Sequence, residues 1–450
     1  MIKKNNKKTI NLIIFIILII LILTSCSNSK ESLNVKIKGS QEEQKEQEDK
    51  MQDLEEEKKI RGIKSRDAKY VEEKLLDYEI KKISDIEFYS LCAYKLACEL
   101  VGDELWYIGY EEEKDRLSID SINIKTGEHK VHKVISTSYD RIYYGGENIW
   151  FSLDFSFCLD DLRERAKVPL LRYNLKEGKF YEYTKKELLN VSYATVFEDG
   201  RYAWVGSEGG IIKIDLKNNS IKTENKYGKY VMSIIGDSER IWIGSIGYEK
   251  EGGVKEIDKD GNIIAVYNRS NFLIDNFVVD LILDKHDNLW INWGGEGYAG
   301  VTCLNLKTKD SKHFMGFIDE RFSPEKMIDI LDEYNGFLWM DEEGVLWATA
   351  IDNNEDFKDD LCYFDYTIND WRRYHFVPRG SSYTASSFGE YAIIGCGWKN
   401  GVVLFNKRTE EFNWINKDWD VGKIFKIGEK EFLLLTDEGV MKIKFFDKHN

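Results

Sequence analysis

Acidic and aromatic side chains gather in a few polar segments of this 450-residue chain, and they are the residues best suited to chemistry. The candidate ligand-binding residues are Tyr110, Glu112, Phe155, Tyr248, Glu249, Trp293, Glu296, Tyr298 and Trp398. A flat aromatic ring beside a carboxylate suits a sugar ring or a peptide that carries Lys or Arg. These segments therefore predict a recognition surface.

No catalytic motif accompanies these residues. The chain has no G-x-S-x-G, no H-E-x-x-H and no phosphate-cradling glycine loop. Residues 352–356 carry oxygen ligands at alternate positions, as a calcium loop does, but Phe357 stands where that loop needs glycine. We therefore expect no cofactor and no metal, and the sequence assigns no catalytic residue.

A repeat of strand-like runs positions these segments. Each run ends in Asp or Asn, followed by a polar turn, at intervals of 41 to 60 residues. The eight positions are Asn123, Asn174, Asp215, Asp258, Asn305, Asp365, Asn406 and Asp447. That interval predicts an all-β fold, a β-propeller of eight four-stranded blades, with seven blades as the alternative.

The two ends of the repeat should close the ring. The last unit stops at Asp447, where a fourth strand should follow, and Ile86 to Tyr89 is a spare strand before the first complete unit. Pairing these ends leaves no open sheet edge, which favours a soluble monomer. The propeller is therefore expected over residues 83–450.

Tryptophan and cysteine are expected in the core. One Trp recurs at the same place in the second strand of six units, as periodic apolar residues of a packed interior do. These residues are Trp106, Trp150, Trp204, Trp242, Trp290 and Trp347. The cysteines show no C-x-x-C spacing, and those inside strand-like runs are interpreted as small buried groups.

The connections between second and third strands should carry the binding residues. They are long in five units, at residues 110–116, 154–169, 246–252, 293–300 and 352–360, whereas the turns between first and second strands are minimal. Variable loops on a rigid scaffold are where binding residues usually lie. The predicted innermost strands 191–195 and 231–235 contain no acid, and 278–282 contains only Asp280, which favours binding over catalysis.

The N-terminus resembles a bacterial lipoprotein signal. Four lysines precede an apolar run from Ile10 to Leu23, and small residues lead to Cys26. Residues 1–25 are the predicted signal peptide, and a lipid on Cys26 would hold the protein to the outer face of the cytoplasmic membrane. Residues 26–82 are predicted to be a charged spacer, either partly helical or disordered.

The charge of the chain excludes one class of partner. Without residues 1–25, 60 basic residues stand against 79 acidic ones, a net charge of −19. A chain of this charge is not built to bind nucleic acid.

Two segments carry a family resemblance. Trp242-Ile243-Gly244-Ser245 and the run from Gly209 to Asp215 resemble the two-component-regulator propeller repeat of bacterial sensor ectodomains. The resemblance covers most of residues 90–450 and implies the propeller fold. Those sensors continue into a membrane helix and a kinase, neither of which follows in this sequence, so we do not carry a signalling role over.

These observations predict a cell-surface interaction module that binds a peptide, a protein or a glycan through the face with the long loops. The alternative is a carboxylate-dependent lyase or glycoside hydrolase that acts on a surface polysaccharide, because such enzymes need acids at the axis of the ring. The choice depends on whether two acids, or an acid and a histidine, converge there.

Overall fold

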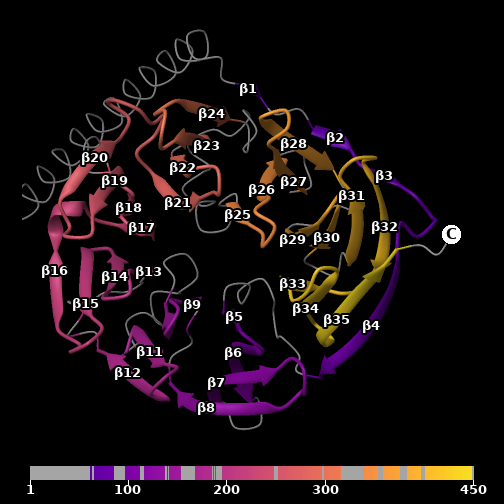
Figure 1. Ribbon diagram of the computed structural model, residues 1–450, viewed down its shortest axis with the longest axis horizontal. Helices are drawn as coiled ribbons and strands as arrows, with labels where there is room; N and C mark the ends of the chain where they lie inside the picture. Colours follow the sequence, from indigo (N-terminus) through magenta and orange to yellow (C-terminus); the bar gives the residue numbers. More distant parts are fainter. Residues whose placement is uncertain are drawn as a thin grey trace, which may run out of the picture. The chain divides into compact units, whose positions relative to one another are not determined.

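The chain folds into an eight-bladed β-propeller (Figure 1). The computed structural model describes residues 61–447 except 63–64, 86–96, 112–115, 137–138, 140, 154–167, 185, 187, 189–194, 248–251, 296–297, 316–337, 353–357, 376–382 and 397–400. In these residues the one helical segment is a short 3-10 turn, η2 (Asn225–Tyr227). No helix in the described ranges has the length and apolar character needed to cross a membrane. The predicted fold class is confirmed.

Blades 1 to 4 follow one another along the chain, and each runs outward from the centre of the ring. Blade 1 contains β5 (Cys98–Val101), β6 (Glu104–Glu111), β7 (Arg116–Asn123) and β8 (His129–Ile135). Blade 2 contains β9 (Arg141–Tyr144), β10 (Asn148–Ser152), β11 (Leu170–Asn174) and β12 (Lys179–Tyr183). Blade 3 contains β13 (Thr195–Glu198), β14 (Tyr202–Ser207), β15 (Gly210–Asp215) and β16 (Ile221–Glu224). Blade 4 contains β17 (Val231–Gly236), β18 (Arg240–Ser245), β19 (Gly253–Asp258) and β20 (Ile263–Tyr267).

Blades 5 to 8 each include a strand from the N-terminal part of the domain. Blade 5 contains β21 (Val278–Leu283), β22 (Asn288–Gly295), β23 (Tyr298–Asn305), β24 (Ser311–Met315) and β1 (Arg61–Gly62). Blade 6 contains β25 (Leu338–Met340), β26 (Leu346–Asp352), β27 (Lys358–Asp365), β28 (Asp370–His375) and β2 (Ser65–Asp67). Blade 7 contains β29 (Tyr383–Phe388), β30 (Tyr391–Cys396), β31 (Val402–Asn406), β32 (Glu411–Asn416) and β3 (Lys69–Tyr70). Blade 8 contains β33 (Val421–Lys426), β34 (Glu431–Thr436), β35 (Gly439–Phe446) and β4 (Asp77–Ser84).

The second strand of a blade is buried on both faces because it lies between two neighbouring blades. Along β10 every residue is buried, and β18 is buried from Ile241 to Ser245. A strand covered on both faces has a continuous apolar run in place of alternating polar residues. The recurrent tryptophans fill this layer, with exposed fractions of 0 to 3%. Their predicted core role is confirmed.

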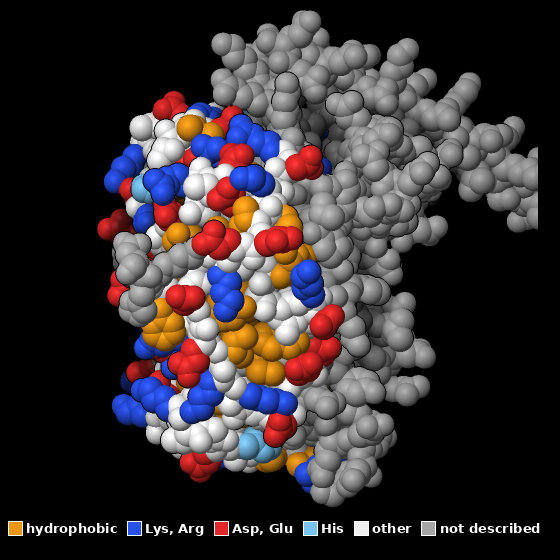
Figure 2. Space-filling view, turned by 90° about the vertical axis from the view of Figure 1, so that its right-hand side faces the viewer, with side chains coloured by type: hydrophobic (Ala, Val, Ile, Leu, Met, Phe, Trp, Pro, Cys, Tyr) orange, Lys and Arg blue, Asp and Glu red, His pale blue; other side chains and the backbone are white. Residues whose placement is uncertain are grey.

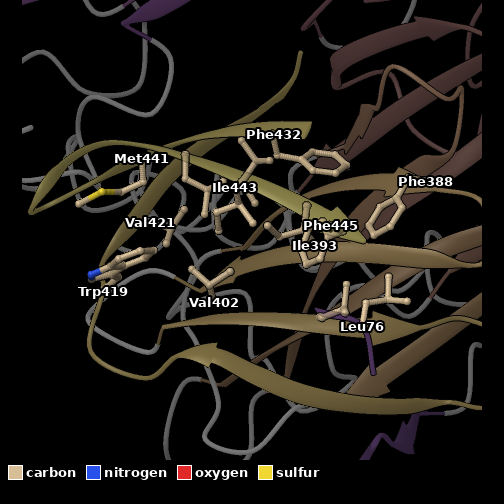
Figure 3. Packing of buried hydrophobic residues seen from close by; sticks show 13 residues of the cluster. Leu76, Phe388, Ile393, Val402, Trp419, Val421, Phe432, Met441, Ile443 and Phe445 are labelled. Carbon is tan, nitrogen blue, oxygen red and sulfur yellow. The ribbon is translucent and has the colours of Figure 1, made fainter. Parts of the chain in front are cut away.

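The hydrophobic core is divided among the spaces between blades. One cluster joins blades 7 and 8, and in Figure 3 Phe388 and Ile393 of blade 7 lie beside Phe432 and Phe445 of blade 8. Another cluster joins the last blade to the first, with Leu433 and Leu435 packed against residues of blade 1. The ring is therefore closed by packing as well as by strand pairing.

The repeated Asp or Asn residue closes the turn after the third strand in blades 1 to 7. The side-chain oxygen of Asp215 accepts the backbone N–H groups of Lys217 at 2.9 Å and Asn218 at 3.2 Å. Asn406 does the same for Arg408 and Thr409. Asn and Asp favour such turns because their short side chains reach backbone donors two and three residues ahead. The repeat found in the sequence is therefore a turn signal.

The strand that closes the ring is β4 and not Ile86 to Tyr89, which lie outside the described residues. β4 pairs antiparallel with β35, from Asp77 opposite Phe446 to Ser84 opposite Val440. β4 reads Asp-Tyr-Glu-Ile-Lys-Lys-Ile-Ser and is mostly exposed. Outermost strands face solvent, so β4 lacks the apolar run by which strands were recognised. Closure through both ends of the chain is confirmed, with this change of strand.

The N-terminal part of the domain also lies along three further blades, which corrects the prediction of a helical or disordered spacer for residues 61–62 and 65–82. β1, β2 and β3 pair in parallel with the outer strands β24, β28 and β32. Figure 2 views the rim from the side where β3 and β4 lie and shows apolar side chains among acidic and basic ones. Residues 61–84 thus form a strap around half of the ring.

Two ion pairs fasten the strap to the rim. Arg66 pairs with Glu410 at 3.0 Å, and Lys69 pairs with Glu411 at 2.7 Å. The backbone N–H of Leu75 also donates to the Asn413 side chain at 3.1 Å. Because the ion pairs are exposed, we expect the backbone pairing to hold the strap more than the charges do.

No disulfide joins the four described cysteines, and three of the four are buried. Burial raises the pKa of Cys98 to about 11 and that of Cys303 to about 12, so both thiols are protonated at neutral pH. Cys362 and Cys396 are also buried. This confirms the structural interpretation for these four, whereas Cys92 and Cys158 lie outside the described residues.

Candidate functional site

Connections of the blades emerge at two opposite faces of the ring. Turns between first and second strands, and between third and fourth strands, lie on what we call the turn face. Connections between second and third strands, and between consecutive blades, lie on the loop face. This separation follows from the antiparallel order of the four strands in each blade.

The long connections predicted from the sequence are partly extensions of strands. β22 continues to Gly295 and β23 begins at Tyr298, so residues 293–300 form a hairpin with a two-residue connection. The prediction of a long loop there is wrong. The connections from β10 to β11 and from β18 to β19 are long in sequence, at residues 153–169 and 246–252.

Trp293 is a core residue, which contradicts its predicted role in binding. Its side chain is fully buried, and its indole N–H donates to the Thr302 hydroxyl at 2.9 Å. A Cβ atom placed on Gly300 would lie 2.6 Å from the Trp293 ring, so the glycine makes room for the indole. An apolar residue in a strand next to a loop was mistaken for a loop residue.

The other predicted binding residues remain predictions. Tyr110 and Tyr298 lie in β6 and β23, at the loop-face ends of these strands. The remaining candidates, which lie outside the described residues, are Glu112, Phe155, Tyr248, Glu249, Glu296 and Trp398. Cys26 and the calcium-like segment after Asp352 also lie outside them.

A pocket of about 380 Å³ lies among the inner strands of blades 1, 2 and 3, which line the centre of the ring in Figure 1. We call it the axial pocket. Its lining residues are Glu99, Ile142, Tyr143, Tyr144, Gly145, Trp150, Val196, Phe197 and Glu198. Several of these residues are at the turn-face ends of β9 and β13, so the pocket is not part of the loop face.

Glu198 is the most perturbed group of the axial pocket. Its carboxylate accepts hydrogen bonds from the Trp150 indole and from the Asn148 amide, the latter at 3.3 Å. Burial raises the pKa of Glu198 to about 7, although these two donors and the charge of Arg172 oppose the change. A carboxyl group with this pKa changes its charge in the physiological range.

The position of Glu198 depends on the neighbouring blade. A Cβ atom on Gly145 would lie 2.4 Å from the Glu198 carboxyl carbon, so only glycine leaves space for this side chain. On the other wall, Glu99 pairs with Lys423 at 3.5 Å, and Lys423 also donates to the Cys98 carbonyl at 2.9 Å. The two acids of the pocket thus have different environments.

The contact between Trp150 and Glu198 departs from a pattern seen in other blades. In blades 3, 5 and 6 the indole N–H donates at 2.8 Å to an Asp in the turn of the same blade. The pairs are Trp204 with Asp199, Trp290 with Asp284, and Trp347 with Asp341. The turn of blade 2 reads Gly145-Gly146-Glu147-Asn148 and contains no Asp. An acid from blade 3 takes its place.

Sequence reasoning missed Glu99 and Glu198. The innermost strand of the third unit was predicted at residues 191–195, but β13 is Thr195–Glu198, so an acid does stand on it. The available signal was the missing Asp before Trp150. Asp280, the acid noted on β21, accepts a hydrogen bond from Ser233 at 2.9 Å and links blades 4 and 5.

Comparison with known proteins finds structural similarity only at low sequence identity. No protein-family model and no curated protein matches the chain. Among solved structures, the extracellular domain of the putative one component system BT4673 from B. thetaiotaomicron is 13% identical, with a TM-score of 0.40. The alignment covers 78% of this chain and 59% of that structure, so this chain spans less than two thirds of its length.

Two further solved structures are similarly distant. A streptogramin B lyase is 10% identical with a TM-score of 0.43, and the alignment covers 82% of this chain and 98% of that structure. The Dos1 propeller is 9% identical with a TM-score of 0.47, and the alignment covers 77% of this chain and 90% of that structure. Identities and TM-scores this low carry no conclusion about activity. The class defined here is an all-β, eight-bladed propeller closed by both ends of its chain.

Proposed function

We propose that the protein is a lipid-anchored binding module at the outer face of the bacterial cytoplasmic membrane, which recognises a peptide, a protein or a glycan through its loop face. The observation that carries the proposal is the unequal distribution of connections. The strand ends that border the long connections, such as Ser152 and Leu170 of blade 2, lie on the loop face, whereas the turn face has short turns. Variable loops on a rigid ring are suited to recognition.

Tyr230 on the loop face adds support from a described residue. It lies between blades 3 and 4, has a φ of 49°, and its side chain is 46% exposed. Among the described non-glycine residues with positive φ, Tyr230 is the only aromatic one. This conformation costs a non-glycine residue about 1 kcal/mol or more.

Two backbone hydrogen bonds hold Tyr230 in this conformation. Its N–H donates to the Glu208 carbonyl, and its carbonyl accepts the Ile246 N–H, both at 3.0 Å. Glu208 and Ile246 border the connections of blades 3 and 4 between second and third strands. A strained, exposed tyrosine fixed between two loops suits stacking against a ligand.

Charge and anchoring define the partner that we propose. The net charge of −15 for the whole chain favours cationic or neutral partners over nucleic acid. A lipid on Cys26 would supply the contact with the membrane, and the propeller itself would act as a monomer.

The test is binding of the full-length protein to an array of surface glycans and cationic peptides. We expect Tyr230→Ala to weaken saturable binding by about tenfold, as loss of an exposed aromatic anchor does. Tyr70→Ala is the matched control, because Tyr70 is 48% exposed but lies on the rim, and this variant should bind within about twofold of the wild type. Equal binding by Tyr230→Ala would contradict the role of the loop face.

The same assay separates binding from catalysis. Release of a product from a glycan would favour the carboxylate-dependent lyase or hydrolase. Two acids do line the axial pocket, but Glu99 is engaged by Lys423, and Glu198 is held by two donors of blade 2. Because an acid–base pair needs two available carboxylates, the ion pair of Glu99 favours binding over catalysis.

A further inference from the structure

The axial pocket contains a carboxylate that lacks a partner of opposite charge. Glu198 has two neutral hydrogen-bond donors, Trp150 and Asn148, and among the described residues it forms no ion pair. A buried cation whose charge acts on Glu198 is Arg172. Its guanidinium donates to Asn219 at 2.7 Å and lies over the rings of Trp150 and Tyr181.

The charge of Arg172 acts on Glu198, but among the described residues the two groups form no ion pair. The aromatic ring of Trp150 contacts both groups, with its N–H on Glu198 and its face toward the guanidinium at 5.7 Å. A partly buried carboxylate without a counter-charge is costly in its ionised form. A bound cation would reduce this cost.

The walls of the axial pocket accept hydrogen bonds more readily than they donate them. Its only side chains that carry a formal charge are Glu99 and Glu198, and no Lys or Arg is among the described lining residues. The backbone N–H of Gly145 is already bonded to the Asn148 carbonyl at 2.9 Å. Each oxygen of Glu198 receives one donor, which leaves acceptor capacity for a ligand.

Aromatic side chains complete the site. Tyr143, Tyr144 and Phe197 line the pocket, and Tyr144 is 47% exposed, so it borders the opening. Aromatic faces attract ammonium and guanidinium groups, and carboxylates supply the opposite charge. The volume of about 380 Å³ suits a small molecule or one long side chain.

We propose that the axial pocket binds an organic cation, a primary ammonium or guanidinium group, between Glu198 and the ring of Tyr144. This site is separate from the loop face and does not depend on the function proposed for that face. The cation would donate to the free acceptor positions of Glu198 and would neutralise its charge.

The direction of the pH dependence follows from the groups around Glu198. Burial and the nearby Glu147 raise its pKa to about 7, and Arg172, Trp150 and Asn148 oppose this. Glu99 faces the same pocket with its charge compensated by Lys423. Because the cation needs the ionised carboxylate, binding should strengthen by about tenfold from pH 6 to pH 8.

The test is calorimetric titration of the full-length protein with agmatine and n-butylamine, with 1-pentanol and pentanoate as neutral and anionic probes. We expect agmatine and n-butylamine to bind and the neutral and anionic probes not to bind. Glu198→Gln should weaken the binding of agmatine by at least about tenfold. Glu239→Gln is the matched control, because Glu239 is an exposed acid in a turn of blade 4 on the same face. That variant and Tyr230→Ala should bind agmatine as the wild type does.

Three outcomes would overturn the proposal: no binding of either cation, equal binding of 1-pentanol, or unchanged agmatine affinity in Glu198→Gln. If Glu198→Gln fails to fold, Tyr144→Ala replaces it, since a half-exposed side chain at the opening can be removed without loss of core packing. We expect that variant to bind agmatine several-fold more weakly, and unchanged affinity would refute the site.

Discussion

Trp150 of blade 2 donates its indole N–H to Glu198 of blade 3, so a hydrogen bond crosses from one blade to the next beside the axial pocket. In blades 3, 5 and 6 the corresponding indole is satisfied within its own blade. Glu198 therefore links two neighbouring blades and also lines the pocket. Changes at this residue should affect both stability and binding.

Replacing Glu198 by Gln should remove a pH dependence of folding stability. The folded state keeps the Glu198 proton up to about pH 7, whereas the unfolded state loses it near the ordinary pKa of 4.5. The proton thus stabilises the fold below pH 4.5, and this stabilisation is lost as the pH rises to 7. The free energy of unfolding falls by at most about 3 kcal/mol over this pH range.

Urea unfolding at pH 5 and pH 8 measures this effect. The free energy of unfolding of Glu198→Gln minus that of the wild type should increase between the two values, because the other titrating groups cancel in the difference. Glu239→Gln serves as a control, and its free energy of unfolding minus that of the wild type should be the same at both pH values. A constant difference for Glu198→Gln as well would show that Glu198 titrates normally in the folded protein.

Trp293 should behave as a core residue. Trp293→Ala should lower the free energy of unfolding by about 3–5 kcal/mol, because a fully buried side chain leaves a cavity. Trp293→Phe keeps most of the packing and loses the hydrogen bond to Thr302, so we expect a loss of about 1–2 kcal/mol in the free energy of unfolding. Thermal and urea unfolding give both values. Normal stability of Trp293→Ala together with weaker ligand binding would instead support the surface role predicted from the sequence.

The strand β4 should be needed to close the ring. A chain that begins at Asp77 keeps all pairing with β35, whereas a chain that begins at Asp85 leaves β35 as an open edge. We expect the first chain to be monomeric and folded, and the second to aggregate or unfold. Size-exclusion chromatography and circular dichroism distinguish these results, and a monomeric, folded chain from residue 85 would show that β4 is dispensable.

The features that could be predicted are those that repeat along the sequence. Asp215 and its equivalents close turns, and residues such as Trp204 fill the spaces between blades, so spacing alone led to the eight-bladed ring. β4 was missed because an outermost strand exposes one face and contains charged residues such as Lys81 and Lys82. The strap pairs by backbone hydrogen bonds, which leave no apolar pattern.

The candidate sites were harder to predict because they depend on departures from the repeat. Glu198 faces the axial pocket because blade 2 lacks the Asp that other turns provide to their Trp. Tyr230 is notable for its backbone conformation, which sequence alone does not reveal. Trp293 was assigned to a loop because the second strand of a blade differs in length from one blade to the next. In blade 5 the length of this strand, β22, is set by its pairing with β23.

Asp215→Ala should show the contribution of one turn of the repeat. This change removes the acceptor for the N–H groups of Lys217 and Asn218, and we expect a loss of about 1 kcal/mol in the free energy of unfolding. Asp215→Asn keeps the acceptor oxygen and should differ from the wild type by only a few tenths of a kcal/mol. Urea unfolding compares the variants, and equal losses would mean that charge, not the turn, is responsible.

Tyr230→Gly should separate strain from recognition on the loop face. Glycine adopts a φ of 49° without steric cost, so the variant should be as stable as the wild type or more stable by up to about 1 kcal/mol. Because the exposed ring is lost, binding to the loop face should weaken as in Tyr230→Ala. Tyr230→Ala keeps a Cβ atom in the strained conformation and should be the less stable of the two. If Tyr230→Gly were clearly less stable than the wild type, the ring of Tyr230 would contribute to packing and its strain would not indicate a ligand site.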